Sequence, residues 1–216
     1  MPRTSRRIIW AIVAGLLALV VFQLSRLRVT PPSADSESIW TATVKKGSML
    51  WQVRGSGILI PSVHSANLIA RVMVPDSFAH DIRLNQNAEV DALNLTTMGH
   101  VSYINPSPSN AMRSVDISLD SALPISAGAS LQVDAIIELG KLSNILYVER
   151  PVHAYQNNSM GVFKVVDDRG NAVRVNVNFG RASVNTIEVL DGLREGDMII
   201  PSDMSAWDNF DQIRLR

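Results

Sequence analysis

The sequence has 216 residues and contains no cysteine. Disulfide bonds and thiolate-bound zinc are therefore excluded, and the fold must rest on apolar packing and hydrogen bonding. Internal repeats, low-complexity segments and an apolar heptad pattern are also missing, so no coiled coil is expected. Without disulfides, repeats or coiled coils, most of the chain is expected to form an ordinary globular fold.

Basic charge is scarce outside the first 34 residues. Lys and Arg together number 20, as do Asp and Glu, but five of the arginines precede Asp35. The remainder carries fifteen basic residues against twenty acidic ones, without the clustered Lys and Arg that nucleic-acid binding needs. We therefore expect no nucleic-acid partner.

Motifs of common catalytic and metal sites are missing as well. The four histidines lie far apart in sequence, without the spacing of metal-ligand pairs. Asp167 and Asp168 lack the spacing of a calcium loop. Gly55-Ser56-Gly57 lacks the third glycine of a phosphate loop and the full nucleophile elbow. We expect no enzyme activity, no catalytic residue, no metal ligand and no cofactor; an anchored hydrolase is the least favoured interpretation.

One long apolar run is present, at residues 8–24, and it carries no charge. As a helix it would span about 25 Å, close to the ~30 Å hydrocarbon core of a bilayer. A cleaved signal peptide would have a shorter apolar region followed by a small-residue cleavage site, which is absent. We predict a transmembrane anchor within residues 1–28, with membrane-anchoring side chains at Ile8, Trp10, Leu16, Val20 and Leu24.

The flanks of this run indicate its orientation. Arg3, Arg6 and Arg7 precede it and Arg26 and Arg28 follow it. The positive-inside rule therefore favours a cytoplasmic N-terminus, and one large domain on the far side is the simplest topology. The expectation is a single-pass protein of the bacterial inner membrane, anchored in lipid by this helix, with the bulk of the chain in the periplasm.

After a linker at residues 29–38, β patterns dominate. The clearest has Val173, Val175, Val177 and Phe179 alternating with polar residues. Short strands with Gly and Asn turns predict a mainly β fold of small barrels or sandwiches, with one helix at residues 75–84. Turns or breaks are expected at 45–48, 55–57 and 140–144. The candidate strands are residues 40–44, 49–53, 58–60, 68–74, 88–93, 99–104, 115–119, 130–139, 145–149, 160–167, 172–179, 186–190, 198–201 and 212–215.

Four segments of the last third form a recognisable set: residues 146–152, 161–165, 174–189 and 191–203. With their spacing, they resemble the membrane-proximal region of HlyD-like membrane fusion proteins, the periplasmic adaptor subunits of ABC and RND efflux pumps. Residues 73–76, 81–82, 86–88 and 99–106 resemble the β-barrel domain of that family. Residues 44–47 and 55–57 resemble its first strand.

The resemblance implies a domain order. It places the anchor at 1–28, the linker at 29–38, a β-barrel domain at 58–139, and a discontinuous membrane-proximal β domain at 39–57 and 140–216. Family-pattern residues with a structural role are then Gly192, Leu193, Gly196 and Asp197 in the last block, and Gly99 and Pro106 in the barrel. Independently of the family, Gly192 and Gly196 suit tight turns around a buried Leu193, with Asp197 bonding the loop backbone.

The sequence departs from the family between Gly57 and Leu68. Members normally insert a lipoyl-like domain and a long α-helical hairpin there, whereas this chain has only residues 58–67. The family uses the hairpin to meet the outer-membrane channel and to pack its hexamers. Contact with such a channel is therefore not expected, and a homo-oligomer is left open.

The resemblance implies an adaptor that docks on an inner-membrane transporter. An ABC partner is favoured over an RND partner, because residues 180–189 and 202–207 look more like adaptors of macrolide-type exporters. Two alternatives remain. One is a truncated, non-bridging remnant or regulatory decoy of such an adaptor, and the other is a membrane-tethered binding module unrelated to transport.

Overall fold

The structure is a computed structural model that describes residues 33–34, 39–62, 68–92, 95–121 and 130–215. Helical structure in these ranges is confined to the short 3-10 helices η2 (Asp76–Phe78) and η3 (Ser205–Trp207), and strands make up most of the rest. The prediction of a mainly β fold is confirmed. None of the helices in these ranges has the length and apolar character to cross a bilayer. The predicted anchor lies outside the described residues.

Strands follow one another along the whole described chain. From the N-terminal side they are β1 (Ser33–Ala34), β2 (Ala42–Thr43), β3 (Lys45–Pro61), β4 (Leu68–Pro75), β5 (Asn87–Ala92), β6 (Leu95–Ile104), β7 (Met112–Leu119), β8 (Gln132–Glu149), β9 (Ser159–Val165), β10 (Asn171–Ala182), β11 (Thr186–Asp191), β12 (Met198–Ile199) and β13 (Gln212–Leu215).

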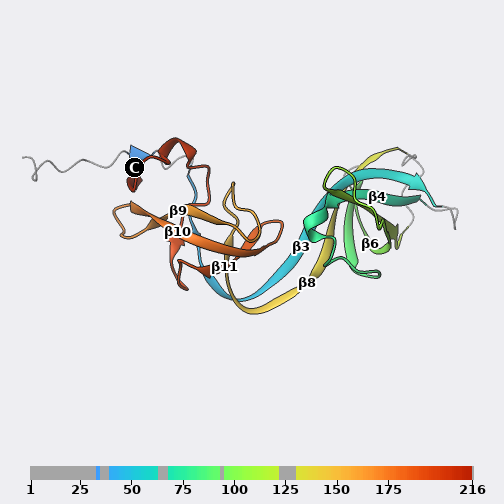
Figure 1. The fold of residues 1–216 in the computed structure, drawn as a ribbon, viewed down its shortest axis with the longest axis horizontal. Coiled ribbons are helices and arrows are strands. Elements are labelled where there is room, and N and C mark those ends of the chain that lie inside the picture. The colour runs from blue at the N-terminus through green and yellow to red at the C-terminus, as the bar shows by residue number, and fades with distance from the viewer. Residues whose placement is uncertain (1–32, 35–38, 63–67, 93–94, 122–129, 216) are drawn as a thin grey trace, which may run out of the picture.

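Six strands close into a small barrel, which we call the barrel lobe (Figure 1). The order runs β3-β4-β7-β6-β5-β8, and β8 pairs with both β5 and β3, so the ring has no free edge. Every neighbouring pair in the ring is antiparallel. The expected small β-barrel is therefore present.

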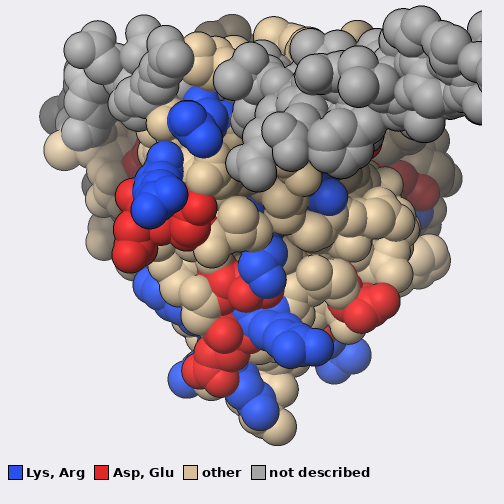
Figure 2. All heavy atoms as spheres, turned by 90° about the vertical axis from the view of Figure 1, so that its left-hand side faces the viewer, with Lys and Arg blue, Asp and Glu red and all other residues tan. Residues whose placement is uncertain are grey.

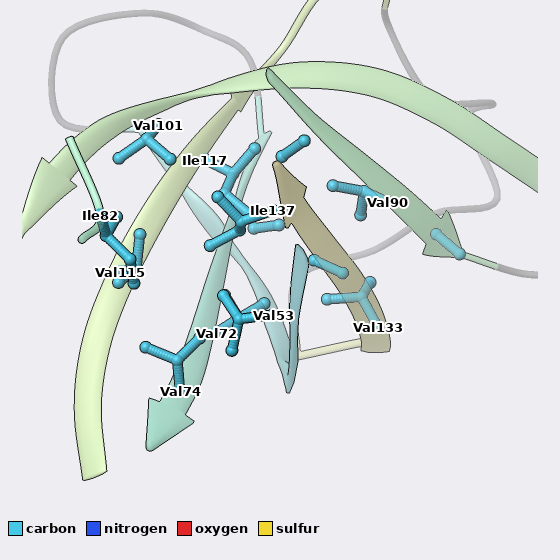
Figure 3. Close-up of a cluster of buried hydrophobic side chains, with 14 of the residues drawn as sticks. Val53, Val72, Val74, Ile82, Val90, Val101, Val115, Ile117, Val133 and Ile137 are labelled. Atoms are coloured by element: carbon cyan, nitrogen blue, oxygen red, sulfur yellow. The ribbon is translucent and has the colours of Figure 1, made fainter. Parts of the chain in front are cut away.

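The barrel interior is filled by alternate residues of its strands. On β4, Ala70, Val72 and Val74 are fully buried, and the residues between them are more exposed. The inward side chains of the other strands meet them in one apolar cluster (Figure 3). Alternation of this kind is expected for strands with one face toward a core.

The remaining strands form a second unit, which we call the terminal lobe. Its sheet runs β3-β8-β11-β10-β9-β12-β2. A single residue, Val44, separates β2 from β3, so the two ends of this sheet are adjacent pieces of chain. Val44, Val177, Phe179 and Ile187 belong to the apolar cluster enclosed by the sheet. A smaller cluster around Ile213 joins the C-terminal segment to β9 and β10.

Two long strands connect the lobes, and here the predicted breaks are wrong. Residues 45–48, expected as a turn, are the first residues of β3, which then continues through 55–57. β8 continues through 140–144 in the same way. Gly57 lies where the β4 backbone approaches closely, since a Cβ there would be 1.9 Å from the Arg71 carbonyl oxygen. Glycine at this position allows close strand packing instead of ending the strand. The paired strands β3 and β8 form a two-stranded ribbon between the lobes. Register shifts between Gly47 and Met49 and between Trp51 and Gln52 bend this ribbon.

The predicted helix at residues 75–84 is also wrong. Only η2 is helical in this segment, and turns follow it. Ile82 is buried in the barrel core, and the Gln86 amide donates to the carbonyl oxygens of Asp81 and Leu139. A short helix is only marginally stable by itself. Burying the two apolar side chains of this segment against the barrel core stabilises it more than an isolated turn of helix would.

The two ends of the described chain meet in the terminal lobe. Ser33 and Ala34, within the segment expected as a linker, pair in parallel with Arg214 and Leu215 of β13. This pairing lies at the end of the molecule farthest from the barrel lobe (Figure 1).

Candidate functional site

The last family-like block forms a tight corner between β11 and β12. Gly192 and Gly196 have positive φ angles of 95° and 86°, a conformation that favours glycine. Leu193 between them is buried. A Cβ on Gly192 would lie 2.3 Å from the Asn176 carbonyl oxygen, so the corner also packs tightly on β10. Asp197 completes the corner by accepting a hydrogen bond of 2.8 Å from the Arg194 N–H.

Asp197 also ties the corner to β9. Burial alone would raise the pKa of its carboxyl group. The Lys164 ammonium at 2.7 Å and the Arg194 N–H together outweigh burial and hold that pKa below its ordinary value. The Asp197 carbonyl in turn accepts from the Val44 N–H, and the Gly196 N–H donates to the Val44 carbonyl. The corner thus fixes the course of the chain from β2 into β3.

A groove of about 880 Å³ opens beside this segment, and we call it the end groove. One wall is formed by residues 41–43 and Lys45, and the other by residues 147–152 and 184–186. It forms because β3 pairs with β8 only as far as the register pair Lys45–Tyr147. From there β2 turns away to pair with β12.

The walls of the end groove expose backbone hydrogen-bonding groups. Val44 bonds toward the β12 side, so the N–H and C=O of its neighbour Thr43 point toward β8. On the opposite wall, the Arg150 N–H donates to the Asn185 carbonyl, so the backbone groups of Glu149 point toward β2. In the described part of the chain β2 pairs with β12 alone. Two open strand edges therefore face each other across the groove.

An apolar rim borders these open edges. Trp40 is 48% exposed, and its indole N–H donates to a Glu149 carboxylate oxygen at 3.1 Å. Its backbone N–H donates to the Ser202 hydroxyl. Val152 on the other wall is 50% exposed. Open edges with apolar side chains beside them suit an extended peptide that adds as a strand.

The ribbon that joins the lobes is anchored by the turn between β10 and β11. The buried Ser183 hydroxyl donates to the Leu50 carbonyl at 2.8 Å and accepts from the Gln52 N–H at 3.0 Å. These are the backbone groups freed by the register shift after Trp51. The Trp51 indole N–H donates to the Ala182 carbonyl, so the bent part of β3 is held against the terminal lobe.

An ion pair supports the same turn. Arg181 donates through Nε and Nη2 to the two carboxylate oxygens of Glu188, at 2.9 and 3.1 Å, and its guanidinium lies over the Trp51 ring. The hydrogen bonds from Arg181 outweigh burial and lower the pKa of Glu188, so this buried carboxylate stays ionised. Sequence reasoning missed Ser183, Arg181 and Glu188, because their partners come from a strand more than 100 residues earlier or from an unrecognised cross-strand pair.

The other predicted site residues lie apart from this region. Gly99 on β6 packs against β7, where a Cβ would lie 2.5 Å from the Ser118 carbonyl oxygen. Pro106 lies in the loop between β6 and β7, and its carbonyl accepts from Arg113. The anchor residues Ile8, Trp10, Leu16, Val20 and Leu24 fall outside the described residues.

The described residues offer no metal-ion site. In the described ranges, His, Asp and Glu side chains form no group of three that could hold a metal ion. On the end of the molecule that carries the C-terminus, basic and acidic side chains are intermixed (Figure 2). The end groove can bind a partner through its open backbone edges and through apolar contacts.

Comparison with known proteins gives limited matches. No family model and no curated protein matches the sequence. The crystal structure of ZneB from Cupriavidus metallidurans is similar at a TM-score of 0.34 and 13% identity, over 63% of this chain and 40% of that one. The crystal structure of MacA from Actinobacillus actinomycetemcomitans is similar at 0.38 and 14%, over 63% and 43%. This chain thus spans less than half of either protein, and similarity at this level places it in no family.

Proposed function

We propose that this chain is a non-enzymatic, adaptor-type binding subunit of an export system at the bacterial inner membrane. Residues 1–28 would anchor it, and the terminal lobe would dock on an ABC or RND transporter, with an ABC partner favoured. The single observation that best supports the proposal is the β1–β13 pairing, which holds the start of the described chain in the terminal lobe. The sequence resemblance to membrane fusion proteins supplies the partner class.

The length of chain before β1 supports the position of the lobe. Eight residues separate Leu24 from Ser33. Even fully extended, this distance is at most about 30 Å. An anchor ending at Leu24 therefore keeps the terminal lobe at the membrane surface, with the barrel lobe farther away.

The end groove is the proposed docking point. Its open edges at Thr43 and Glu149 offer backbone donors and acceptors to an extended segment of the transporter's periplasmic surface. Strand addition supplies affinity through main-chain hydrogen bonds, and the flanking Trp40 and Val152 supply apolar contacts. A binding subunit of this kind needs no catalytic residue.

One structural feature favours an adaptor that does not bridge to the outer membrane. β3 and β4 pair as far as Pro61 and Leu68, so strand pairing continues well into the stretch between Gly57 and Leu68 where the family inserts its lipoyl-like domain and hairpin. The barrel closes without that insertion. This feature equally suits the second candidate, a regulatory decoy that occupies the transporter. Overproducing a decoy would raise susceptibility to the exported compounds, whereas a working adaptor would leave susceptibility unchanged or lower it.

Co-purification tests the proposal. The full chain, extracted in mild detergent, should retain a transporter permease encoded beside its gene. Val152→Arg, which puts a charge on the end groove, should reduce the retained permease at least about tenfold, the loss of roughly 1.4 kcal/mol of binding. Met98→Arg on the barrel lobe is the matched control, because Met98 has the same 50% exposure as Val152. No permease with the unaltered chain would contradict the proposal and favour a tethered module unrelated to transport.

A further inference from the structure

A second groove, of about 980 Å³, lies between the two lobes, and we call it the interlobe groove. Both lobes contribute to its walls. The residues that matter most are Val53, Arg54, Pro75 and Phe78 from β3 and the near end of the barrel, and Arg150 and Tyr155 from the terminal lobe. Gln156 beside Tyr155 donates to the Ser77 carbonyl at 3.4 Å, so the two lobes are in contact at the groove.

The charge of the lining has one sign. Arg54 and Arg150 line the groove, and no acidic residue does so in the described part of the chain. Arg54 is exposed and makes no ion pair with any described residue. Asp134 and Glu138 lie diagonally across from it on β8, at a backbone separation of roughly 7–8 Å, and neither forms an ion pair with it. An anion in the groove would therefore find an unpaired guanidinium.

On the opposite wall, hydrogen bonds within the terminal lobe fix the position of the Arg150 side chain. Its Nε donates to the Ala154 carbonyl at 2.8 Å and its Nη1 to the Ser183 carbonyl at 3.3 Å. These bonds fix the guanidinium plane and leave Nη2 available to a ligand. A donor that is already positioned loses little side-chain entropy on binding.

The rest of the lining is suited to an apolar body. Phe78 is half-buried at the rim of the barrel core, and Tyr155 is 62% exposed on the terminal-lobe side. Aromatic rings contribute large contact area with few rotatable bonds. The volume lies at the upper end of the roughly 300–1,000 Å³ range of small-molecule sites.

From these observations we infer that the interlobe groove binds a small amphipathic anion, with an aromatic body between Phe78 and Tyr155 and its carboxylate or sulfonate between Arg54 and Arg150. Because the groove takes its walls from both lobes, such a ligand contacts both at once and favours the lobe orientation in which the groove is formed. The two grooves share Arg150, Val184 and Asn185. Arg54, Phe78 and Tyr155 line the interlobe groove alone, so the inference does not rest on transporter docking.

The test uses 1-naphthoate as the probe and the full chain in lipid nanodiscs. Titration calorimetry, with empty nanodiscs subtracted, should show saturable one-site binding. The uncharged 1-naphthamide should bind at least about tenfold more weakly, as expected when a charge-assisted contact is lost. Arg54→Glu should weaken naphthoate binding by a similar factor and leave naphthamide binding nearly unchanged, a difference that mere unfolding would not produce.

Two controls separate the site from its surroundings. Arg169→Glu makes the same charge change on an exposed hairpin arginine outside the groove and should leave the Kd unchanged. Tyr155→Ser should weaken both probes equally. Absence of saturable naphthoate binding, equal affinity for the amide, or an unchanged Kd in Arg54→Glu would each overturn the inference, whatever the outcome of the co-purification.

Discussion

At the scale of single residues, the ion pair between Arg181 and Glu188 stabilises the turn on which the interlobe ribbon rests. The Glu188 side chain is almost fully buried, whereas Arg181 is partly exposed. Most of the stabilisation therefore comes from the three hydrogen bonds that the carboxylate accepts from Arg181.

Glu188→Gln should lower the free energy of unfolding by about 1–3 kcal/mol at pH 7, because one side of a charge-assisted pair is lost. The folded-state pKa of Glu188 lies below its ordinary value of 4.5. The contribution is thus complete above about pH 4.5 and is lost as the pH falls through the folded-state pKa. Urea unfolding of the full chain in detergent should show the difference at pH 7 and a smaller one near pH 3. A difference that grows on acidification would contradict this assignment.

Ser183 is the second residue with a measurable role. Ser183→Ala leaves the Gln52 N–H and the Leu50 carbonyl without their partner, which should cost about 1–3 kcal/mol. Hydrogen exchange at the Gln52 amide should accelerate accordingly. Ser56→Ala is the matched control, since Ser56 is an exposed serine of the same strand, and it should change neither quantity. Unchanged exchange at Gln52 would show that the hydroxyl does not hold the ribbon.

At the scale of elements, we expect Gly47 and Gly57 of β3 to differ in their tolerance of substitution. Gly57→Ala should destabilise the barrel by about 3 kcal/mol or more, because the new methyl group meets the β4 backbone. Gly47→Ala on the same strand should stay within about 0.5 kcal/mol, because its nearest neighbour is the Tyr147 ring at 3.9 Å. Thermal unfolding of both variants measures the contrast, and equal Tm values would refute the close packing at Gly57.

These glycines also show where prediction from the sequence stops. Strand β13 and the alternation around Val177 and Phe179 on β10 were predictable, because side chains facing one core leave a period of two. Gly55 and Gly57 look like a strand break, since the sequence does not show that a neighbouring backbone takes the place of their side chains. The segment at 75–84 looks helical in the sequence. The burial of Ile82 in the barrel core, which prevents the helix, is a tertiary effect with no local signal.

The grooves were less predictable than the strands. The end groove depends on the single residue Val44, after which the chain changes partner from β12 to β8. The interlobe groove brings together Arg54 of β3 and Arg150, which follows the end of β8 nearly a hundred residues later. Without a metal-ligand or catalytic spacing, such residues carry no local signal. The glycine corner was the exception, because its turn and its buried Leu193 lie within a few consecutive residues.

At the scale of the whole molecule, the proposed function requires the N-terminus and the terminal lobe to lie on opposite sides of the membrane. The absence of cysteine makes this directly measurable. In intact cells, a membrane-impermeant maleimide that has entered the periplasm should label Ser205→Cys, an exposed position of η3. It should label Ser5→Cys only after the inner membrane is opened. Labelling of Ser5→Cys in intact cells would reverse the proposed topology.

Docking of the end groove on a transporter is the step on which the proposed function depends most. Photo-crosslinking in living cells tests it directly, with p-benzoylphenylalanine placed at Val152 on the groove and, for comparison, at the equally exposed Met98 on the barrel lobe. We expect an ultraviolet-dependent product at position 152 that contains the transporter permease, and little or none at position 98. Crosslinks to the permease that are equal at the two positions, or absent at 152, would show that the end groove is not the docking point.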